Sequence, residues 1–346
     1  MNKIIKTVSI NMLVLLGLLI ISEGISRIFF PESTLTPIFN DSELRSRGRS
    51  FIDPHPTRGF ALKANFRNDL YQSNNLGFRN NEFPAEFDNK YYKVLAIGES
   101  TTFGWQVNNQ NTYPAQLMQL ATEHKVQINA KKLYFVNAGI PSYTSSQTRV
   151  YLEEILLKGQ LKPDLVLLNI MWNDIWYSSV KNWHPDILIY QKPPAVLTWL
   201  LEYSRLAHLI VMGMPSEEKL TDIENPRALQ QYKQNLQAMI ALAQQYNIKL
   251  AFVEPPIDAD HMPEEGLNEF QIRYSKPFFI EQAKQYRNAM QTVASDAKLP
   301  VLNHILSLDN LHQKSLFLDL LHPTEEGNAI MARNIYTPLI KYIRSN

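Results

Sequence analysis

Cysteine is absent from this chain of 346 residues. Its absence excludes disulfides, a thiol nucleophile and cysteine-ligated metal sites. The eight histidines are scattered and form neither an HxH nor an HExxH pattern, so we expect no metal and no cofactor. Charge of one sign is lacking too, because 34 basic residues balance 33 acidic ones and leave a formal net charge of +1. This balance predicts no nucleic acid or other polyanion as a partner.

An apolar stretch near the amino terminus, Val8–Ile21, follows two basic residues, Lys3 and Lys6. The stretch is short for a membrane span, which needs about 20 residues, but it becomes long enough when it continues to Phe30. The basic flank favours a cytoplasmic amino terminus. We therefore expect a single-pass helix, with the rest of the chain on the periplasmic or extracellular side of the membrane.

Two details of this segment bear on whether it is retained. Glu23 and Arg27 are four residues apart, so they can pair on a helix near the outer interface. The apolar core also has the length of a signal peptide, which makes a cleaved signal the alternative. Because Ser22-Glu23-Gly24 is a poor cleavage site, we favour an uncleaved anchor over residues 1–30.

Short apolar runs alternate with helix-like segments from about Lys90 onward. The expected strands are Val94–Ile97, Leu133–Asn137, Leu165–Met171, Leu250–Glu254 and Val301–Leu302. The expected helices are Tyr113–His124, Ser145–Lys158, Pro226–Tyr246, Pro277–Asp296 and Glu325–Ile343. Such alternation predicts a parallel sheet with helices on both faces. The fold class we expect is α/β, a three-layer α/β/α sandwich with a parallel, flavodoxin-like five-stranded sheet, preceded by the transmembrane helix.

A serine follows the first of these strands, in Gly98-Glu99-Ser100. The carboxyl end of a parallel strand is where open α/β sheets bind ligands. A hydroxyl is a weak nucleophile and needs a base within hydrogen-bond reach. His322 is the candidate base, and Asp319 can orient its second ring nitrogen. The alternative for Asp319 is that it caps the helix that follows.

Two further polar groups follow neighbouring strands. Asn137-Ala138-Gly139 ends the second strand, and Asn173-Asp174 follows the third. Because the carboxyl ends of parallel strands meet at one edge of the sheet, we expect these groups to lie beside Ser100.

These four blocks together resemble the SGNH/GDSL hydrolase family, which is named for a serine, a glycine, an asparagine and a histidine in separate blocks. They match at Ser100, Gly139, Asn173 and His322, in the family's order, and span most of the chain after residue 93. Glu99 stands where the family usually has Asp, a residue that is not its catalytic acid. Met171 replaces the usual Gly of Gly-x-Asn-Asp, so we expect a reshaped pocket around Asn173.

The resemblance implies catalysis by Ser100, His322 and Asp319. Attack of a serine on an ester carbonyl creates an oxyanion, which needs preorganised donors. The expected donors are the backbone N–H groups of Ser100 and Gly139 and the side-chain amide of Asn173. A turn role for Gly139 and for Asn173 is the alternative.

Residues 31–89 form an expected amino-terminal extension that packs on a hydrolase domain of residues 90–346. An Asn-x-x-Gly-Phe-Arg stretch that ends at Arg79 resembles one in membrane-anchored, exported family members. We expect it to be a structural hairpin, with contact between Arg79 and an anionic substrate as the alternative. The insertions expected to shape the substrate site are residues 175–224, with an amphipathic stretch at Ala195–Met214, and residues 255–278.

The function we expect is that of a membrane-anchored serine esterase that acts through an acyl-serine intermediate. The expected partner is an ester-bearing substrate, first of all an O-acetylated cell-envelope or secreted glycan, and second a lipid. An acyltransferase would use the same triad and differ only in the acceptor of the acyl group. A binding module without turnover is disfavoured, because Ser100, Gly139, Asn173, Asp319 and His322 are all present.

Overall fold

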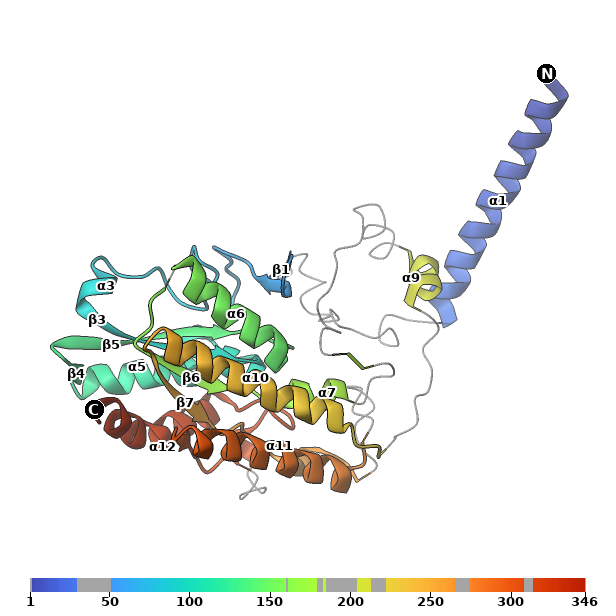
Figure 1. Ribbon diagram of the computed structural model, residues 1–346. Coiled ribbons are helices and arrows are strands. Elements are labelled where there is room, and N and C mark those ends of the chain that lie inside the picture. Colours follow the sequence, from blue (N-terminus) through green and yellow to red (C-terminus); the bar gives the residue numbers. More distant parts are fainter. Residues whose placement is uncertain are drawn as a thin grey trace. The chain divides into compact units, whose positions relative to one another are not determined.

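The computed structural model describes residues 2–29, 51–159, 161–178, 183–184, 204–212, 222–264, 274–307 and 314–345 (Figure 1). The chain divides into two compact units, and each is described by itself. One unit comprises residues 1–50 and 191–218, and the other comprises residues 51–190 and 219–346.

A six-stranded sheet forms the centre of the larger unit, in the order β4-β5-β3-β6-β7-β8. Its strands are β3 (Tyr91–Gly98), β4 (Gln127–Ile128), β5 (Lys131–Gly139), β6 (Leu165–Asn169), β7 (Lys249–Val253) and β8 (Val301–Leu302). All neighbours pair in parallel except β4 and β5. The five parallel strands confirm the expected α/β class and have the flavodoxin-like order.

The antiparallel edge strand β4 is a sixth strand that the sequence did not predict. It forms a hairpin with β5 through Asn129 and Ala130, whose φ angles are 50° and 63°. Positive φ at both central residues is the signature of a type I′ turn, and the usual sequence at these two positions is Asn-Gly. Here alanine replaces glycine, and a two-residue strand shows no periodicity, so neither signal was present.

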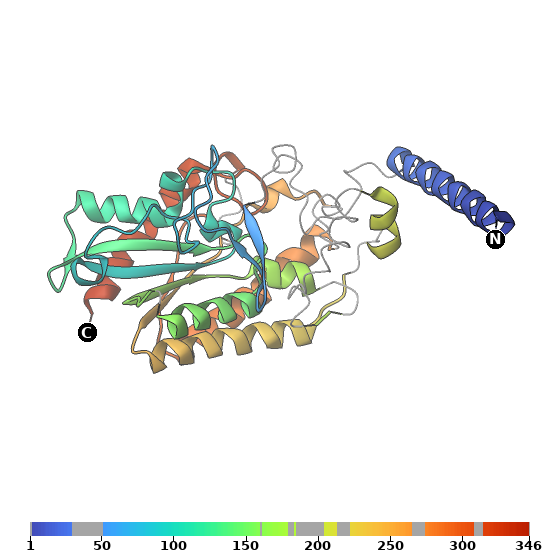
Figure 2. The ribbon, with the colours of Figure 1, turned by 90° about the horizontal axis from the view of Figure 1, so that it is seen from above.

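Helices cover both faces of the sheet, as the alternating pattern predicted. They are α5 (Tyr113–Glu123), α6 (Ser145–Lys158), α10 (Pro226–Gln245), α11 (Lys276–Asp296) and α12 (Glu325–Arg344). Figure 2 shows α5 and α12 on one face and α6 and α10 on the other, and α11 packs beside α10. Four of these helices begin at a residue whose side chain accepts a backbone N–H of the first turn: Thr112, Asn225, Ser275 and Thr324. Such caps satisfy N–H groups that otherwise lack a partner.

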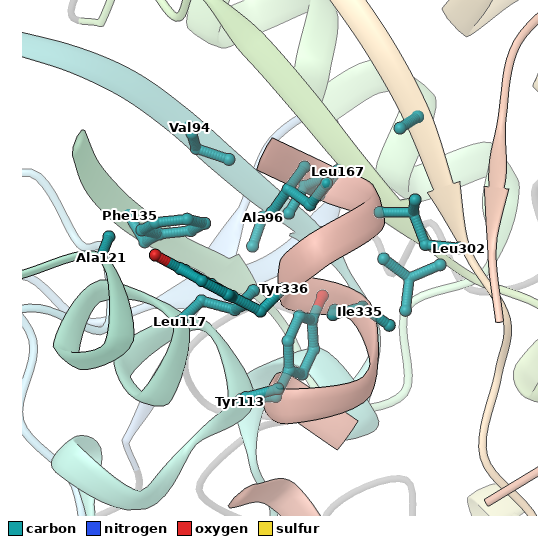
Figure 3. Close-up of a cluster of buried hydrophobic side chains, with 14 of the residues drawn as sticks. Val94, Ala96, Tyr113, Leu117, Ala121, Phe135, Leu167, Leu302, Ile335 and Tyr336 are labelled. Atoms are coloured by element: carbon teal, nitrogen blue, oxygen red, sulfur yellow. The ribbon is translucent and has the colours of Figure 1, made fainter. Parts of the chain in front are cut away.

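The core on the α5 and α12 face brings together residues that are far apart in the chain (Figure 3). Val94 of β3 and Phe135 of β5 face Leu117 of α5 and Ile335 of α12, and each is at most 1% exposed. Burial of a large apolar side chain stabilises a fold by about 1.5–3 kcal/mol. This cluster therefore holds the last helix, and the loop that precedes it, against the sheet.

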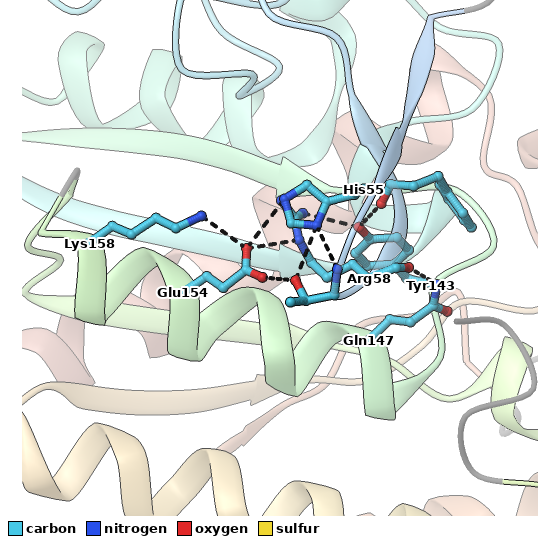
Figure 4. A network of polar contacts seen from close by, with 8 residues as sticks. His55, Arg58, Tyr143, Gln147, Glu154 and Lys158 are labelled. Atoms are coloured by element: carbon cyan, nitrogen blue, oxygen red, sulfur yellow. Dashed lines mark hydrogen bonds and ion pairs between the residues drawn. The ribbon is translucent and has the colours of Figure 1, made fainter. Parts of the chain in front are cut away.

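A hairpin of β1 (Ile52–His55) and β2 (Gly59–Leu62) packs on α6 through a polar network (Figure 4). Arg58 in the turn lies 3.1 Å from the Glu154 carboxylate and donates to the Tyr143 hydroxyl at 3.1 Å. Its carbonyl accepts from Gln147 at 2.8 Å. The hairpin is thus attached to α6 and to the segment that precedes it by charge and hydrogen bonds.

The smaller unit contains α1 (Asn2–Phe29) and α9 (Arg205–Met212). Among the described residues, α1 is the single helix long and apolar enough to cross a membrane, with a segment Ile5–Phe29 of mean hydropathy 2.1. The eight residues of α9 fall within the expected amphipathic stretch Ala195–Met214, and the rest of that stretch lies outside the described residues, apart from Ser204.

Replacement of Arg58 by Met should destabilise the larger unit by roughly 1.5–3 kcal/mol. The Glu154 carboxylate would lose its arginine partner and keep the Thr57 donor, and the Tyr143 hydroxyl would lose a donor. Lys158→Met is the matched control. Lys158 lies 3.6 Å from the same carboxylate, but its side chain is 53% exposed, so its loss should cost less than about 1 kcal/mol. Urea unfolding of both variants measures the difference. Equal losses would contradict the role given to Arg58.

Candidate active site

The nucleophile segment turns sharply from β3 into the short helix α4 (Ser100–Phe103). Gly98 makes the turn possible, since a Cβ on this residue would overlap the carbonyl oxygen of Asn169 on the neighbouring strand β6. Ser100 is the first residue of α4 and therefore stands at the carboxyl edge of the sheet.

Ser100, His322 and Asp319 are joined by two hydrogen bonds. The Nε2 atom of His322 lies 2.8 Å from Ser100 Oγ, and its Nδ1 atom lies 2.7 Å from Asp319 Oδ2. Proton transfer between a serine and a base requires heavy atoms about 2.6–3.2 Å apart. The structure thus brings Ser100 to a histidine and an aspartate that follow it by more than 200 positions in the chain.

The acid is held by the turn that it shares with the base. Asp319 Oδ1 accepts the backbone N–H groups of Leu321 at 2.8 Å and His322 at 3.0 Å. Burial would raise the pKa of Asp319, but the charge on His322 and these hydrogen bonds outweigh it and lower the pKa to about 2. The helix that follows is capped by Thr324, so Asp319 does not serve as its cap.

A second carboxylate, Glu99, lies directly before the serine and is fully buried. Its two oxygens accept the backbone N–H groups of Met171, Trp172 and Asn173 at 2.9–3.1 Å. These residues begin α7 (Trp172–Ser178), whose first N–H groups have no partner within the helix. Glu99 therefore joins the nucleophile turn to the helix that carries Asn173.

The sequence predicted that the strand before Asn173 continues to Met171. In the structure β6 ends at Asn169, and Asn173 lies in the first turn of α7. Its Nδ2 atom donates to Glu99 Oε2 at 2.6 Å and to the Tyr143 carbonyl oxygen at 3.1 Å. Both amide hydrogens are thus engaged. Asn173 is beside the nucleophile segment as expected, but its amide already has two acceptors.

Burial raises the pKa of Glu99 to about 8, although the backbone donors of α7 lower it. Every hydrogen-bond partner given above for this carboxyl group is an N–H donor. Four donors are best satisfied by an ionised carboxylate, which offers acceptor sites alone. Its hold on Asn173 should therefore tighten as the pH rises through about 8.

The N–H of Gly139 is bonded within the protein in this structure. This N–H donates to Asn137 Oδ1 at 3.0 Å, and a Cβ on Gly139 would overlap the backbone nitrogen of Phe103 in α4. The glycine lets β5 approach α4 closely. It lies beside the nucleophile segment as predicted, with a packing role that the sequence did not reveal.

Arg79, which ends the Asn-x-x-Gly-Phe-Arg stretch, is 2% exposed. It donates to the carbonyl oxygens of Phe103, Gly104 and Val107, which follow the nucleophile. Burial lowers the pKa of this guanidinium to about 9. Its donors are directed into the protein, so the structural interpretation is supported and contact with an anionic substrate is not.

Trp105 is a neighbour of the site that the sequence analysis missed. Its ring centroid lies 6.2 Å from that of His322. It follows α4 by two residues, and no spacing rule connects it with a histidine more than 200 residues away. Trp172, by contrast, is 1% exposed and stacks on Phe279, as expected of a core residue.

The family follows from a comparison with known families. The model of the GDSL-like lipase/acylhydrolase family matches residues 96–330, which is more than half of the chain. The chain therefore belongs to this family and is a hydrolase that acts on ester bonds. No curated protein sequence matches it.

Solved structures show a similar fold at low sequence identity. The psychrotrophic esterase EstA from Pseudoalteromonas sp. is 15% identical, with a TM-score of 0.45 over 73% of this chain and 100% of its own. The acetyl xylan esterase AlAXEase is 19% identical, with a TM-score of 0.43 over 71% and 99%. A catalytic mutant of the acetylxylan esterase Axe2 from Geobacillus stearothermophilus is 16% identical, with a TM-score of 0.42 over 74% and 95%.

Replacement of Gly139 by Ala tests the packing role of this glycine. A Cβ would force β5 away from α4, so the variant should lose at least about 1–3 kcal/mol of stability, as overpacked sites do. Its melting temperature and its activity should fall together. Gly17→Ala is a control for the added methyl group alone, because no atom lies within 4 Å of its Cβ. A stable Gly139→Ala protein with reduced kcat would point back to an oxyanion role.

Proposed function

We propose that this protein cleaves esters through an acyl-serine intermediate on Ser100. His322 takes the Ser100 proton at Nε2 as Oγ bonds to the carbonyl carbon, and it returns the proton to the leaving alcohol when the ester C–O bond breaks. Water, deprotonated by His322, then bonds to the acyl carbon. The bond between this carbon and Oγ breaks, His322 returns the proton to Oγ, and the acid is released. Asp319 holds the imidazole and stabilises its charged form. The observation that carries this proposal is the pair of hydrogen bonds at 2.8 and 2.7 Å.

The oxyanion in this proposal is bound by the Ser100 backbone N–H and by the Asn173 amide. The hydrogen that Asn173 now gives to the Tyr143 carbonyl oxygen at 3.1 Å is the one shared with the substrate, because the other is held at 2.6 Å by Glu99, a partner that becomes charged as the pH rises through about 8. Hydrogen bonds to a charged acceptor are roughly twice as strong as neutral ones. Glu99 is thus a positioning residue, which fixes the amide without touching the substrate.

The substrate that we favour is an ester on a cell-envelope or secreted glycan, with an acetyl group as the acyl part. Two of the similar structures are of acetyl xylan esterases, which makes this a natural first assay. A lipid ester is the second candidate, on account of the apolar helix α1. Transfer of the acyl group to a sugar hydroxyl would need the same residues, with a different acceptor in place of water.

We further propose that α1 anchors the protein in a membrane, with Lys3 and Lys6 in the cytoplasm and the hydrolase unit outside. The segment Ile5–Phe29 is 25 residues long, enough for a hydrocarbon core about 30 Å thick. The basic residues at its start favour this orientation. The substrate would then be met in the periplasm or outside the cell.

Ser100→Ala should lower kcat for aryl acetates by several orders of magnitude, because the triad acts as a unit. Asp319→Asn should also weaken turnover strongly, since the amide favours the wrong tautomer of His322. A fluorophosphonate should label Ser100 in the wild type and leave Ser100→Ala unlabelled. Surface variant Ser345→Ala serves as the control for both measurements. Full turnover by a folded Ser100→Ala protein would refute the mechanism.

Glu99→Gln should reduce kcat roughly ten- to a hundredfold, less than the hundred- to thousandfold effect of removing an oxyanion donor. In the wild type, kcat should rise as the pH passes about 8, where Glu99 ionises and holds Asn173 more firmly. The variant should lack this rise.

Asp174→Asn is the matched control for the pH profile. Asp174 is the next residue to Asn173, and burial raises its pKa to about 7, but it bonds to Ser145 and not to Asn173. It should keep the rise near pH 8. A rise that persists in Glu99→Gln would show that another group titrates there.

A reporter enzyme that is active only after export should be active when fused to the carboxyl terminus. The same fusion without residues 1–30 should be inactive, and the full-length protein should require detergent for extraction. A soluble form that begins near Ile25 would show a cleaved signal peptide. Detection of the carboxyl terminus in the cytoplasm would overturn the proposed orientation.

A further inference from the structure

The last part of α1 carries a polar face that an isolated membrane helix would not need. From Leu18 onward, every residue of the helix is exposed except Ser22, Glu23 and Ser26. Residues spaced by three or four lie on one face of a helix. The Ser26 hydroxyl donates to the Ser22 carbonyl at 2.7 Å, and Ser26 is 5% exposed. The covered face therefore coincides with the polar face.

Glu23 in this face binds the amino terminus of α9, which lies beside the end of α1 (Figure 1). Its carboxylate accepts the backbone N–H of Arg205 at 2.8 Å and of Leu206 at 2.9 Å. The Ser204 hydroxyl donates to the same carboxylate at 2.8 Å and accepts from the Ala207 N–H at 3.0 Å. A residue some 180 positions away in the chain thus supplies part of the cap of α9.

The depth of Glu23 in the membrane places this contact near the boundary between the hydrocarbon core and the lipid headgroups. Glu23 follows Thr7, the first residue after Lys6, by 16 positions, which is about 24 Å of helix at about 1.5 Å per residue. The hydrocarbon core is about 30 Å thick, so Glu23 lies near its outer edge. Unpaired N–H groups at this depth would be costly, and the carboxylate of Glu23 satisfies two of them.

The composition of α9 suits the same boundary. Its sequence, Arg205-Leu206-Ala207-His208-Leu209-Ile210-Val211-Met212, has one formal charge, at its start, and six apolar residues. Ile210 is 73% exposed. An apolar helix that lies in the interface buries such side chains among lipid chains. Water would leave Ile210 exposed next to the exposed apolar surface of α1.

We propose that α9 lies in the outer interface of the lipid bilayer, where Glu23 fastens it to the end of α1. The insertion between α7 and α10 would then return to the membrane, so that the hydrolase unit is connected to the bilayer through the chain at two places. This inference rests on the proposed anchoring by α1. Its partner is lipid, in the outer leaflet.

The absence of cysteine makes the lipid contact directly measurable. A single Ile210→Cys substitution, labelled with an environment-sensitive fluorophore, is reconstituted as the full chain in vesicles of phosphatidylethanolamine and phosphatidylglycerol. Nitroxide on the lipid chain near the headgroup should quench the label, and aqueous iodide should not. A label at Ser345→Cys should show the opposite pattern. Quenching of the Ile210 label by iodide would overturn the proposal. A label that neither iodide nor the lipid nitroxide quenches would also overturn it, because protein, such as a second copy of the chain, would then cover Ile210.

The Glu23 contact has its own test in this background. Glu23→Gln with the Ile210→Cys label should lose most of the lipid quenching, while Arg27→Gln, which removes a partner of Glu23 outside α9, should keep most of it. In the chain without the Ile210→Cys label, a short thiol crosslinker should join Ser26→Cys, on the covered face of α1, to Ala207→Cys in the first turn of α9, with Glu23 and Ser204 left intact. The same crosslinker should not join Ile21→Cys, on the opposite face of α1, to Ala207→Cys. A protein that does not crosslink at Ser26 would refute the contact.

Flotation of the vesicles separates this proposal from the one on which it rests. Protein that does not float with vesicles refutes anchoring by α1. Protein that floats but has a water-exposed label at Ile210 refutes the role of α9 alone. Activity on a soluble aryl acetate, equal in all these variants, shows that the hydrolase unit is intact.

Discussion

The buried carboxylate of Glu99 connects the two parts of the site that come from neighbouring strands. β3 and β6 are adjacent, and Gly98 pairs with Asn169 where they end. After these ends one chain turns into α4 and the other into α7, so both helices begin within reach of one side chain. Three N–H groups at the start of α7 need acceptors, and Glu99 supplies them. The place of Asn173 beside Ser100 depends on that contact.

The described part of the amino-terminal extension, residues 51–89, supports the segment that follows Ser100. Arg79 of this part donates to three carbonyl oxygens of that segment, and Asn137 of β5 donates to the Thr102 carbonyl oxygen. Loss of this buried guanidinium would leave the carbonyl oxygens that it binds without partners, which would lower the stability of the unit. The extension is thus part of the hydrolase unit in a physical sense, since it shapes the loop that contains Trp105.

The blocks with Ser100, Asp319 and His322 could be found in the sequence because each occupies a position that topology dictates. A residue at the carboxyl end of a parallel strand, or in the loop before the last helix, reaches the same edge of the sheet whatever the details of packing. Gly139 was placed near this edge for the same reason. Its N–H direction was not predictable, because it depends on the side chain of Asn137, two residues earlier. The engaged amide of Asn173 depends likewise on Tyr143, which lies 30 residues away.

The sequence by itself determined the α/β class, the five parallel strands and the bounds of the main helices within a few residues. It also placed Ser100, His322 and Asp319 at the same edge of the sheet. These follow from periodicity, caps and strand order, which are local or topological properties. Tertiary structure alone decided the direction of each hydrogen-bonding group: the Gly139 N–H points to Asn137, the Arg79 guanidinium to the loop after Ser100, and the accepting carboxylate of Glu23 to the N–H groups of α9. A hydrogen bond is formed over about 3 Å with a narrow range of angles, and no pattern along the chain specifies geometry that fine.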